Sequence, residues 1–476
     1  MSSPFALLSL IVALPLFGML FVLTAKDDAD QPGRNAFNVC AFTIIANITL
    51  IWRVFMLLNE NSRKLQLQEH FNWLSTPDIN IVFGVDTFSL LLILAVHLAI
   101  LIGLSGVRGN LYRQKSLMVF TLLFLSMVTG LFVAADIFSF YIFFEAMLVP
   151  LFMIIGMFGE VKKQELIYRF FLYNFIGALI LFSATMLIYH HYGSISLEQV
   201  SRLPLKGGIA NYIGGAICLS FLSRIPIWPF HYWISSINSG IRNPLAFIIT
   251  ALMPLTALYG FIRFLPPHFS SGIGDYVVWI NIIGAITMVF IALIGLINKD
   301  TQYKIFSYIT VYYIMYLLGI FSNDDVIVAN IGYSLFGFII IVSALEVLSG
   351  YILHKERLAG GSSNGFLCRA RRLSFAYSFM LLAAVGLPVS AVFINNFLII
   401  SKLLGDNIKL GMLLVFALVV AGMTMLQELF RLKSDDNSCR LGKDDDISPA
   451  LFGFMLFIVF ILLMSFIKPL WFVINE

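Results

Sequence analysis

The stretch Leu222-Ser-Arg-Ile-Pro-Ile-Trp-Pro-Phe-His-Tyr-Trp233 decides how the chain is interpreted. It begins inside a long apolar run, yet it contains Arg224, Pro226, Pro229 and His231. Each proline lacks a backbone donor, so a helix must break there. Irregular backbone at membrane depth survives only where protein buries it or where it lines a wet cavity, and a charge there indicates function. The alternative is an arginine that reaches the interface from a helix end, but apolar sequence on both sides favours a broken membrane helix.

The composition excludes a soluble globular protein. Of the 476 residues, 60% are hydrophobic and 12% are charged. The net charge of +4 is small and dispersed, which does not suggest nucleic acid as a partner. The four cysteines are scattered without any Cys-x-x-Cys pair, and no nucleotide-binding or zinc-protease motif is present. We therefore expect an integral membrane protein with no catalytic residues and no metal site of its own.

Apolar runs of membrane-spanning length recur along the chain. A helix needs about 20 apolar residues to cross a bilayer. The pattern predicts an all-α polytopic membrane protein with about 14 transmembrane helices. The predicted spans lie near 4–24, 36–58, 85–106, 116–135, 137–158, 165–190, 210–233, 243–265, 275–297, 304–321, 327–353, 374–400, 408–431 and 448–474.

Basic residues orient these spans. The odd-numbered connections carry most of the lysines and arginines, for example Lys162, Lys163, Arg371 and Arg372. Cytoplasmic connections are the ones enriched in such residues. We therefore expect both termini on the periplasmic or intermembrane side of a bacterial plasma membrane or a mitochondrial inner membrane.

A weak internal symmetry is also present. The span 374–400 contains Gly386-Leu-Pro388 and lies five spans after the span broken at Pro226 and Pro229. Interrupted helices in corresponding places indicate repeated halves, and an odd offset makes the repeats inverted. Two unrelated proline kinks are the alternative. The predicted divisions are 1–110 for spans 1–3, 116–265 and 275–431 for two inverted five-helix repeats, and 448–474 for the last span.

Isolated charges inside the spans are candidates for a proton relay. Glu145 follows Asp136, a predicted helix cap, by nine residues, which places it roughly 13 Å deeper. A carboxylate there must be protonated or paired, and Arg224 is its expected partner, either in a relay or in a static ion pair. His231 is a second relay candidate or a donor to a freed carbonyl. Glu346 is either another relay site or a side chain that reaches the lipid interface.

On these residues the chain resembles the antiporter-like membrane subunits of respiratory complex I, the proton-translocating NADH:quinone oxidoreductase, and most of all its subunit M, which is subunit 4 in mitochondria. The resemblance covers about residues 80–400 and implies fourteen helices in two inverted five-helix repeats, each with a broken helix. The matching segments are Gly84-Val-Asp86-Thr-Phe-Ser89, Asp136 to Pro150, Arg224 to Trp233, Tyr259 to Phe264, Asp300 to Tyr308 and Gly386-Leu-Pro388.

The chain departs from this family at its relay positions. The family's lysine beside the first break is Arg224 here, and its central lysine falls at Leu255. A histidine expected after the break is Asn238, another is replaced within Tyr312-Tyr313, and the carboxylate that ends the pathway is Asn396. Arginine stays charged, and leucine and asparagine carry no exchangeable proton. The resemblance therefore implies a diverged member with an incomplete proton relay.

The resemblance implies a membrane-arm subunit of complex I that is largely structural. It implies no cofactor in this chain, because NADH, FMN, iron–sulfur clusters and quinone belong to partner subunits. The expected partners are the other membrane-arm subunits and the lipid bilayer, and no nucleic acid. A subunit of a multi-subunit cation/proton antiporter is the alternative, since it shares the same ancestry.

Overall fold

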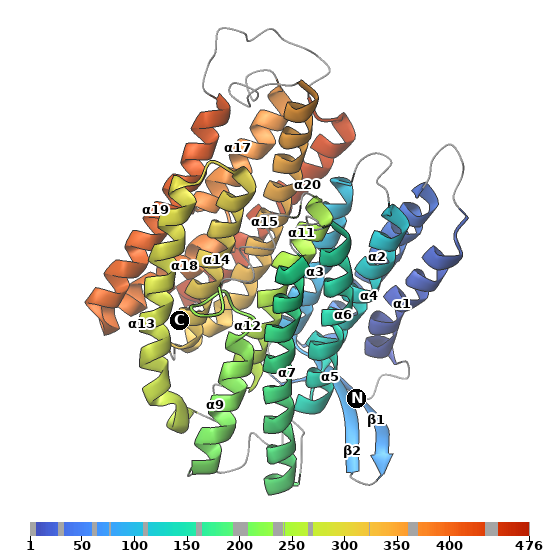
Figure 1. The fold of residues 1–476 in the computed structure, drawn as a ribbon, viewed down its shortest axis with the longest axis vertical. Coiled ribbons are helices and arrows are strands. Elements are labelled where there is room, and N and C mark those ends of the chain that lie inside the picture. Colours follow the sequence, from blue (N-terminus) through green and yellow to red (C-terminus); the bar gives the residue numbers. More distant parts are fainter. Residues whose placement is uncertain are drawn as a thin grey trace. The chain divides into compact units, whose positions relative to one another are not determined.

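The computed structural model describes residues 6–26, 33–59, 64–75, 78–107, 113–158, 164–193, 208–231, 241, 243–264, 270–322, 324–359, 370–433 and 446–475. These residues are almost entirely helical (Figure 1). The helices are α1 Leu7–Thr24, α2 Arg34–Leu57, α3 Thr87–Ser105, α4 Gln114–Val133, α5 Ile137–Ala146, α6 Leu148–Phe158, α7 Gln164–Tyr192, α9 Gly208–Leu222, α11 Pro244–Ala251, α12 Met253–Phe264, α13 Ser270–Ile297, α14 Thr301–Ile320, α15 Asp325–Ala359, α17 Arg371–Val385, α18 Ala391–Asp406, α19 Ile408–Lys433 and α20 Pro449–Asn475.

The helices confirm an α-helical polytopic membrane fold. Twelve helical segments within the described residues are long and apolar enough to cross a bilayer. They correspond to twelve of the predicted spans. The two other predicted spans contain α9 and the pair α17 and α18, which are shorter because the helix is interrupted. The count of fourteen, the inverted repeats and the domain boundaries remain predictions.

A β-hairpin occupies the connection between the spans predicted near 36–58 and 85–106, for which the sequence analysis predicted no structure. Strand β1 (Gln66–Ser75) pairs antiparallel with β2 (Asp78–Val85). The Glu69 carboxylate of β1 accepts hydrogen bonds from the backbone N–H groups of Leu8 (2.8 Å) and Ser9 (3.0 Å). These donors belong to the first turn of α1, which has no intrahelical partners for them. The hairpin therefore caps α1.

The chain divides into two compact units. Unit 1 comprises 1–97, 108–237 and 252–279. In unit 1, α1 packs against α2 and α4, α7 packs against α5 and α9, and α12 packs against α9 and α4. Phe140 anchors the core of this unit, with ring centroids 5.8 Å from Phe221 and 4.7 Å from Phe264.

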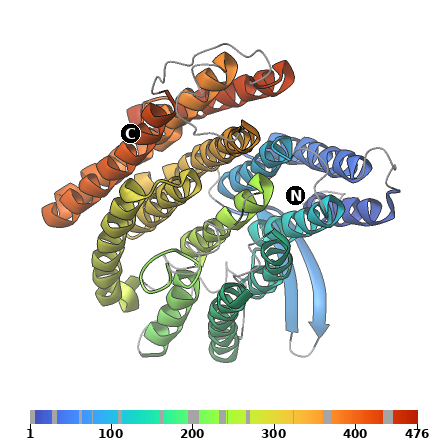
Figure 2. The same cartoon turned by 45° about the horizontal axis from the view of Figure 1, so that its top comes forward.

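Unit 2 comprises 98–107, 238–251 and 280–476. Its longest helix, α15, packs against α11, α14, α17, α18 and α20. Helix α17 packs against both α19 and α20, the orange and red helices of Figures 1 and 2. Nearly every residue of α14 is buried, which places its polar side chains inside the unit rather than at its surface.

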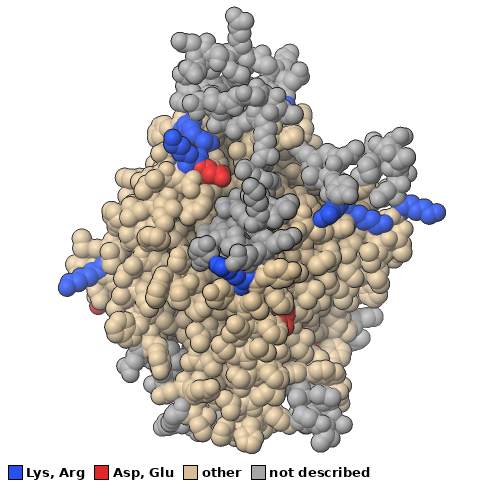
Figure 3. All heavy atoms as spheres, viewed as in Figure 1, with Lys and Arg blue, Asp and Glu red and all other residues tan. Residues whose placement is uncertain are grey.

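The outer surface is the kind that faces lipid. Large apolar side chains such as Phe42, Trp279 and Phe430 are exposed on helices α2, α13 and α19. Figure 3 shows a face made mostly of uncharged residues, with lysines and arginines in a few places. Exposed apolar area on this scale marks a membrane or protein interface.

Four of the membrane helices are interrupted, and prolines lie at or near each interruption. The segment 223–231 after α9 is non-helical and contains Pro226 and Pro229, and the segment 386–390 between α17 and α18 contains Pro388. Gly386 ends α17 in a left-handed conformation (φ 104°), which glycine adopts without strain.

The other two interruptions were missed at the level of sequence. Met147 separates α5 from α6, and Leu252 separates α11 from α12. Pro150 and Pro254 follow two or three residues later, and each removes the donor that a continuous helix needs. These prolines were the available signal.

Candidate functional site

Arg224 lies at the end of α9 in unit 1 and is completely buried, with 0% of its surface exposed. Its Nη2 donates to the Phe144 carbonyl oxygen at 2.6 Å, and its Nη1 lies 3.3 Å from the Met147 sulfur. The guanidinium also stacks over the Phe144 ring. The side chain therefore docks on the junction between α5 and α6, and it holds the break after α9 against that junction.

Glu145 lies one residue after Phe144 and two before Met147, the two residues that Arg224 contacts, but it forms no direct ion pair with Arg224 within the described residues. Its carboxylate is partly buried, and Oε2 has no hydrogen-bond partner among the described residues. The two charges are still close enough to interact electrostatically. The expected partnership thus acts through space, because the guanidinium donors are directed to a carbonyl oxygen and a sulfur atom.

The first break runs from buried residues to the surface of the chain. Pro226 is buried, whereas Pro229 is exposed. Trp228, which lies between the two prolines, is 60% exposed. His231 is partly buried at the end of the described segment. Asn238 lies outside the described residues. The break therefore begins at the fully buried Arg224 and reaches the surface at Trp228.

Two of the positions at which the family resemblance implies titratable groups, Leu255 and Asn396, are neutral and buried. Leu255, on α12 in unit 1, is completely buried. Asn396, on α18 in unit 2, donates from Nδ2 to the Tyr312 hydroxyl at 3.3 Å, and Tyr312 donates to the Ala384 carbonyl oxygen at 3.2 Å. Asn396 is therefore held in a hydrogen-bonded chain that contains no carboxylate and no amine.

Several polar atoms near the second break have no hydrogen-bond partner in the part of the chain that the structure describes. Both amide atoms of Asn395 and the Oδ1 atom of Asn396 are buried and unpaired. Such groups in native proteins usually bind ordered water. We therefore expect these amide atoms to bind water beside the break at Pro388.

Glu346, on α15 in unit 2, is completely buried inside that unit. Its Oε1 accepts a hydrogen bond from Gln302 Nε2 at 3.2 Å, and the same nitrogen donates to the Ile241 carbonyl oxygen at 3.1 Å. Of the two settings that the sequence left open, the structure therefore shows the interior one and not a lipid-facing surface.

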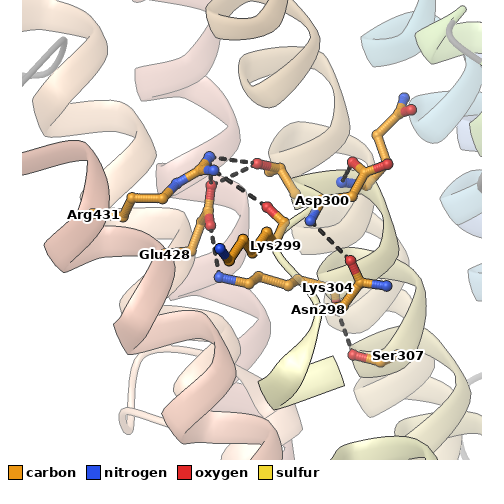
Figure 4. A network of polar contacts seen from close by, with 9 residues as sticks. Asn298, Lys299, Asp300, Lys304, Ser307, Glu428 and Arg431 are labelled. Carbon is orange, nitrogen blue, oxygen red and sulfur yellow. Dashed lines mark hydrogen bonds and ion pairs between the residues drawn. The ribbon is translucent and has the colours of Figure 1, made fainter. Parts of the chain in front are cut away.

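A buried charged network in unit 2 was missed by the sequence analysis (Figure 4). Lys304 of α14 forms an ion pair with Glu428 of α19 at 3.1 Å. Glu428 also accepts from Thr301 at 2.7 Å and from Arg431 at 2.6 Å. Arg431 in turn donates to the Lys299 carbonyl oxygen at 3.3 Å. A glutamate and an arginine three residues apart near the end of a predicted span were the available signal, because such spacing places both on one helix face.

Two of the sequence segments that carry the family resemblance meet in unit 1. The Arg263 guanidinium of α12 binds the Asp86 carboxylate, which also caps α3 by accepting from the Ser89 N–H at 2.8 Å. Arg263 Nε donates to the Tyr259 hydroxyl at 3.1 Å, and Tyr259 donates to the Phe132 carbonyl oxygen at 2.8 Å.

Electrostatics at Asp86, which precedes the span of α3, favour the ionised carboxylate. Burial alone raises the pKa of the Asp86 carboxyl. The Arg263 charge and the hydrogen bonds from Arg263 and Ser89 together outweigh burial and hold this pKa below its usual range. This pair therefore has a structural role in joining α3 to α12.

The fold and these sites define a polytopic helical membrane protein with interrupted helices and buried ionisable side chains. A family model described as NADH:quinone oxidoreductase/Mrp antiporter, transmembrane, matches residues 134–424. The match covers more than half of the chain, and the protein belongs to this family.

Curated relatives match the chain along most of its length. NADH-quinone oxidoreductase subunit M of Rickettsia bellii is 26% identical over 438 residues, which cover 88% of this chain and 86% of the relative. NADH-ubiquinone oxidoreductase chain 4 of Arabidopsis thaliana is 27% identical over 424 residues, which cover 86% of this chain and 83% of the relative.

Solved structures share the fold. A chain of respiratory complex I from Thermus thermophilus superposes with a TM-score of 0.85 at 22% identity, covering 97% of this chain and 96% of that chain. A chain of an archaeal membrane-bound sulfane sulfur reductase gives a TM-score of 0.83 at 16% identity over 98% and 95% of the two chains. A chain of the Mrp complex from Dietzia gives 0.76 at 14% identity, covering 96% of this chain but 49% of its own length.

Proposed function

We propose that the chain is a membrane-arm subunit of a proton-translocating NADH:quinone oxidoreductase, of the subunit M or chain 4 type. One observation carries the proposal: the match to subunit M of Rickettsia bellii extends over 88% of this chain and 86% of that protein, so neither has a large unmatched part. The partners are then the neighbouring membrane-arm subunits, which contact the apolar lateral surface together with lipid.

In this assembly the chain is a non-redox subunit. NADH, FMN, iron–sulfur clusters and quinone bind to partner subunits. The scatter of Cys40, Cys218, Cys368 and Cys439 along the sequence supports this division, because a cluster needs grouped thiolates. The basic odd-numbered connections support an orientation with both termini on the periplasmic or intermembrane side of the membrane.

The subunit is largely structural within the complex. A proton pathway needs groups that both gain and lose a proton, joined by water. Arg224 keeps its charge, and Leu255, Asn238 and Asn396 cannot exchange a proton. Glu145 remains as a titratable group in unit 1, which supports at most a half-channel there.

The alternative is a subunit of a multi-subunit cation/proton antiporter. The family description names both assemblies, and the fold resembles a chain of the Mrp complex. The share of that chain which is covered, 49%, favours the oxidoreductase, because the subunit M relatives match over nearly their whole length.

Affinity purification from native membranes tests the assembly. With a tag at the C-terminus of the full chain, we expect a mild-detergent extract to retain NADH oxidation that depends on the tagged subunit. Retention of sodium-dependent proton exchange after reconstitution, without NADH oxidation, contradicts the proposal and supports the antiporter assembly. An untagged strain carried through the same steps is the control for adventitious capture.

Proton uptake by vesicles that contain the assembled complex tests the structural role. We expect Glu145→Gln to leave the number of protons per NADH unchanged. Loss of a substantial flux in this variant contradicts the interrupted relay. The double variant Leu255→Lys with Asn396→Glu restores the titratable groups that the family resemblance implies, and an unchanged flux there shows that two added groups do not suffice for conduction.

A further inference from the structure

Two buried carboxylates flank the first turn of α14 in unit 2, in opposite electrostatic settings. Glu428 accepts hydrogen bonds from Thr301, Lys304 and Arg431, two of which are cationic. Glu346 accepts one hydrogen bond, from the neutral amide of Gln302. Thr301 and Gln302 are consecutive residues, so both carboxylates contact the same turn of α14. Glu428 is bonded to two cations there, whereas Glu346 is bonded to no described cation.

The surroundings of Glu346 make its charged form unfavourable. The side chain is completely buried, its Oε2 atom has no hydrogen-bond partner in the described chain, and no described lysine or arginine forms an ion pair with it. The charged group that acts on it is Asp300, the cap of α14, which has the same sign. Removing a carboxylate from water without a counter-charge carries a large desolvation penalty.

The surroundings of Glu428 have the reverse effect. Lys304 lies 3.1 Å from one carboxylate oxygen, and Arg431 lies 2.6 Å from the other. Two cations and the positive end of the α14 dipole stabilise the ionised carboxylate. When the environments of two neighbouring acids favour opposite protonation states, one acid can carry a proton while the other stays a fixed negative charge.

We propose that Glu346 is a proton-binding site in unit 2 that holds its proton on Oε2, with Gln302 as its positioning residue and ionised Glu428 across the same turn of α14. Oε1 already accepts the Gln302 N–H, so the proton occupies the oxygen that has no donor. The inference goes beyond the proposed function, because it assigns a proton-binding residue outside Glu145 and the replaced relay positions, and it does not depend on the assembly.

The site exchanges its proton from the cytoplasmic or matrix side. Glu346 lies in the C-terminal half of α15, and Gln302 lies in the first turn of α14. Both ends adjoin odd-numbered connections, which the basic residues Lys299 and Lys355 assign to that side. This placement puts the site near one membrane surface and not at its centre.

Infrared difference spectroscopy of membranes that contain the complete assembly tests the proposal. The difference between wild type and Glu346→Gln should show the loss of one carboxylic acid C=O stretch, which shifts to lower frequency in D2O. Loss of carboxylate stretches without loss of a carboxylic acid band overturns the proposal. The matched variant Glu428→Gln should remove carboxylate bands and leave the Glu346 band in place, and loss of the carboxylic acid band in this variant reverses the assignment and overturns the proposal.

Gln302→Leu tests the positioning role in a chain that keeps both glutamates. It also tests the proposal if the Glu346→Gln variant does not accumulate in the membrane. Removing the donor to Oε1 should move the carboxylic acid band to higher frequency. A purely structural glutamine gives an unchanged band position, which overturns the proposed role of Gln302. These spectra report on the side chains and not on co-purified subunits, so their failure is distinguishable from failure of the assembly.

Discussion

The Lys304 ammonium lies 3.1 Å from the Glu428 carboxylate, with 3% and 2% of the two side chains exposed. The pair joins the start of α14 to the end of α19, and Arg431 completes the charge arrangement from α19 itself. In a buried ion pair each charge compensates the other. Removing one partner therefore destabilises the fold strongly, whereas replacing both with uncharged residues is often tolerated.

Glu428→Gln should therefore destabilise the chain by about 3–5 kcal/mol, because Lys304 is left as an uncompensated buried charge. The double variant Lys304→Met with Glu428→Gln should recover most of this loss, since it removes the orphaned charge and keeps an amide for Thr301 and Arg431. Thermal unfolding of the purified assembly in nanodiscs measures both.

The pair Lys402–Asp406 provides the matched control. It joins neighbouring turns of α18 at 3.4 Å, but the two side chains are 36% and 51% exposed. Exposed pairs contribute about 0–1 kcal/mol, so Asp406→Asn should have little effect. Equal losses in Asp406→Asn and Glu428→Gln contradict the role of burial.

The bond between Asp86 and Arg263 predicts a dependence on pH. Asparagine also caps helices, so Asp86→Asn keeps the contact with Ser89 and removes the charge. Because the folded pKa of Asp86 lies below its unfolded value of about 3.9, the ionised pair stabilises the fold above that pH and loses its effect as the pH falls through the folded pKa. The stability difference between wild type and Asp86→Asn should be full at neutral pH.

The same difference should shrink as the pH falls below about 4, and thermal unfolding in nanodiscs across this range measures it. Arg263→Lys is the companion variant, and it should also lose stability at neutral pH, because an ammonium cannot reproduce the fork that reaches both Asp86 and Tyr259. A difference between wild type and Asp86→Asn that does not change with pH refutes the electrostatic origin.

A close helix contact in unit 1 predicts a steric effect. A Cβ atom added at Gly177 of α7 would lie 2.1 Å from the Ser223 hydroxyl oxygen beside the first break. Gly177→Ala should therefore destabilise by about 1–3 kcal/mol, and Ser223→Gly should rescue it. The control is Gly156 of α6, where an added Cβ meets no atom within 4 Å, so Gly156→Ala should be neutral or slightly stabilising in the same unfolding measurement.

The span pattern and the paired prolines were sufficient to predict the class of fold and two of its helix breaks. Long apolar runs leave few alternatives to a transmembrane helix, and Pro226, Pro229 and Pro388 cannot continue one. The hairpin of β1 and β2 was not predictable in the same way. Its attachment to the start of α1 is made by Glu69 across sixty residues of sequence, which a local pattern does not reveal.

For the charged sites, the sequence revealed the isolated charges but not their partners. An isolated glutamate or arginine within an apolar run is visible in the sequence, so Glu145, Arg224 and Glu346 were found. Partner choice was not visible, because it depends on which atoms a helix junction exposes: Arg224 binds the Phe144 carbonyl oxygen rather than Glu145. Glu428 was overlooked because only the packing of α19 on α14 shows that Lys304 is its partner.

Because Glu145 has no direct ion pair within the described residues and Glu428 has two, the variants Glu145→Gln and Glu428→Gln should differ in stability. Glu145→Gln removes a counter-charge that acts on Arg224 through space but breaks no hydrogen bond to it, since Arg224 donates to Phe144 and Met147. We expect a loss of about 1 kcal/mol, clearly smaller than that of Glu428→Gln, because a direct buried ion pair is lost only in the latter. Arg224→Met should cost more than Glu145→Gln, because it removes the donor to the Phe144 carbonyl oxygen at the junction of α5 and α6. Thermal unfolding of the three variants under one condition ranks them, and a Glu145→Gln loss as large as that of Glu428→Gln shows that the two charges of unit 1 are bound more directly than the contacts of Arg224 imply.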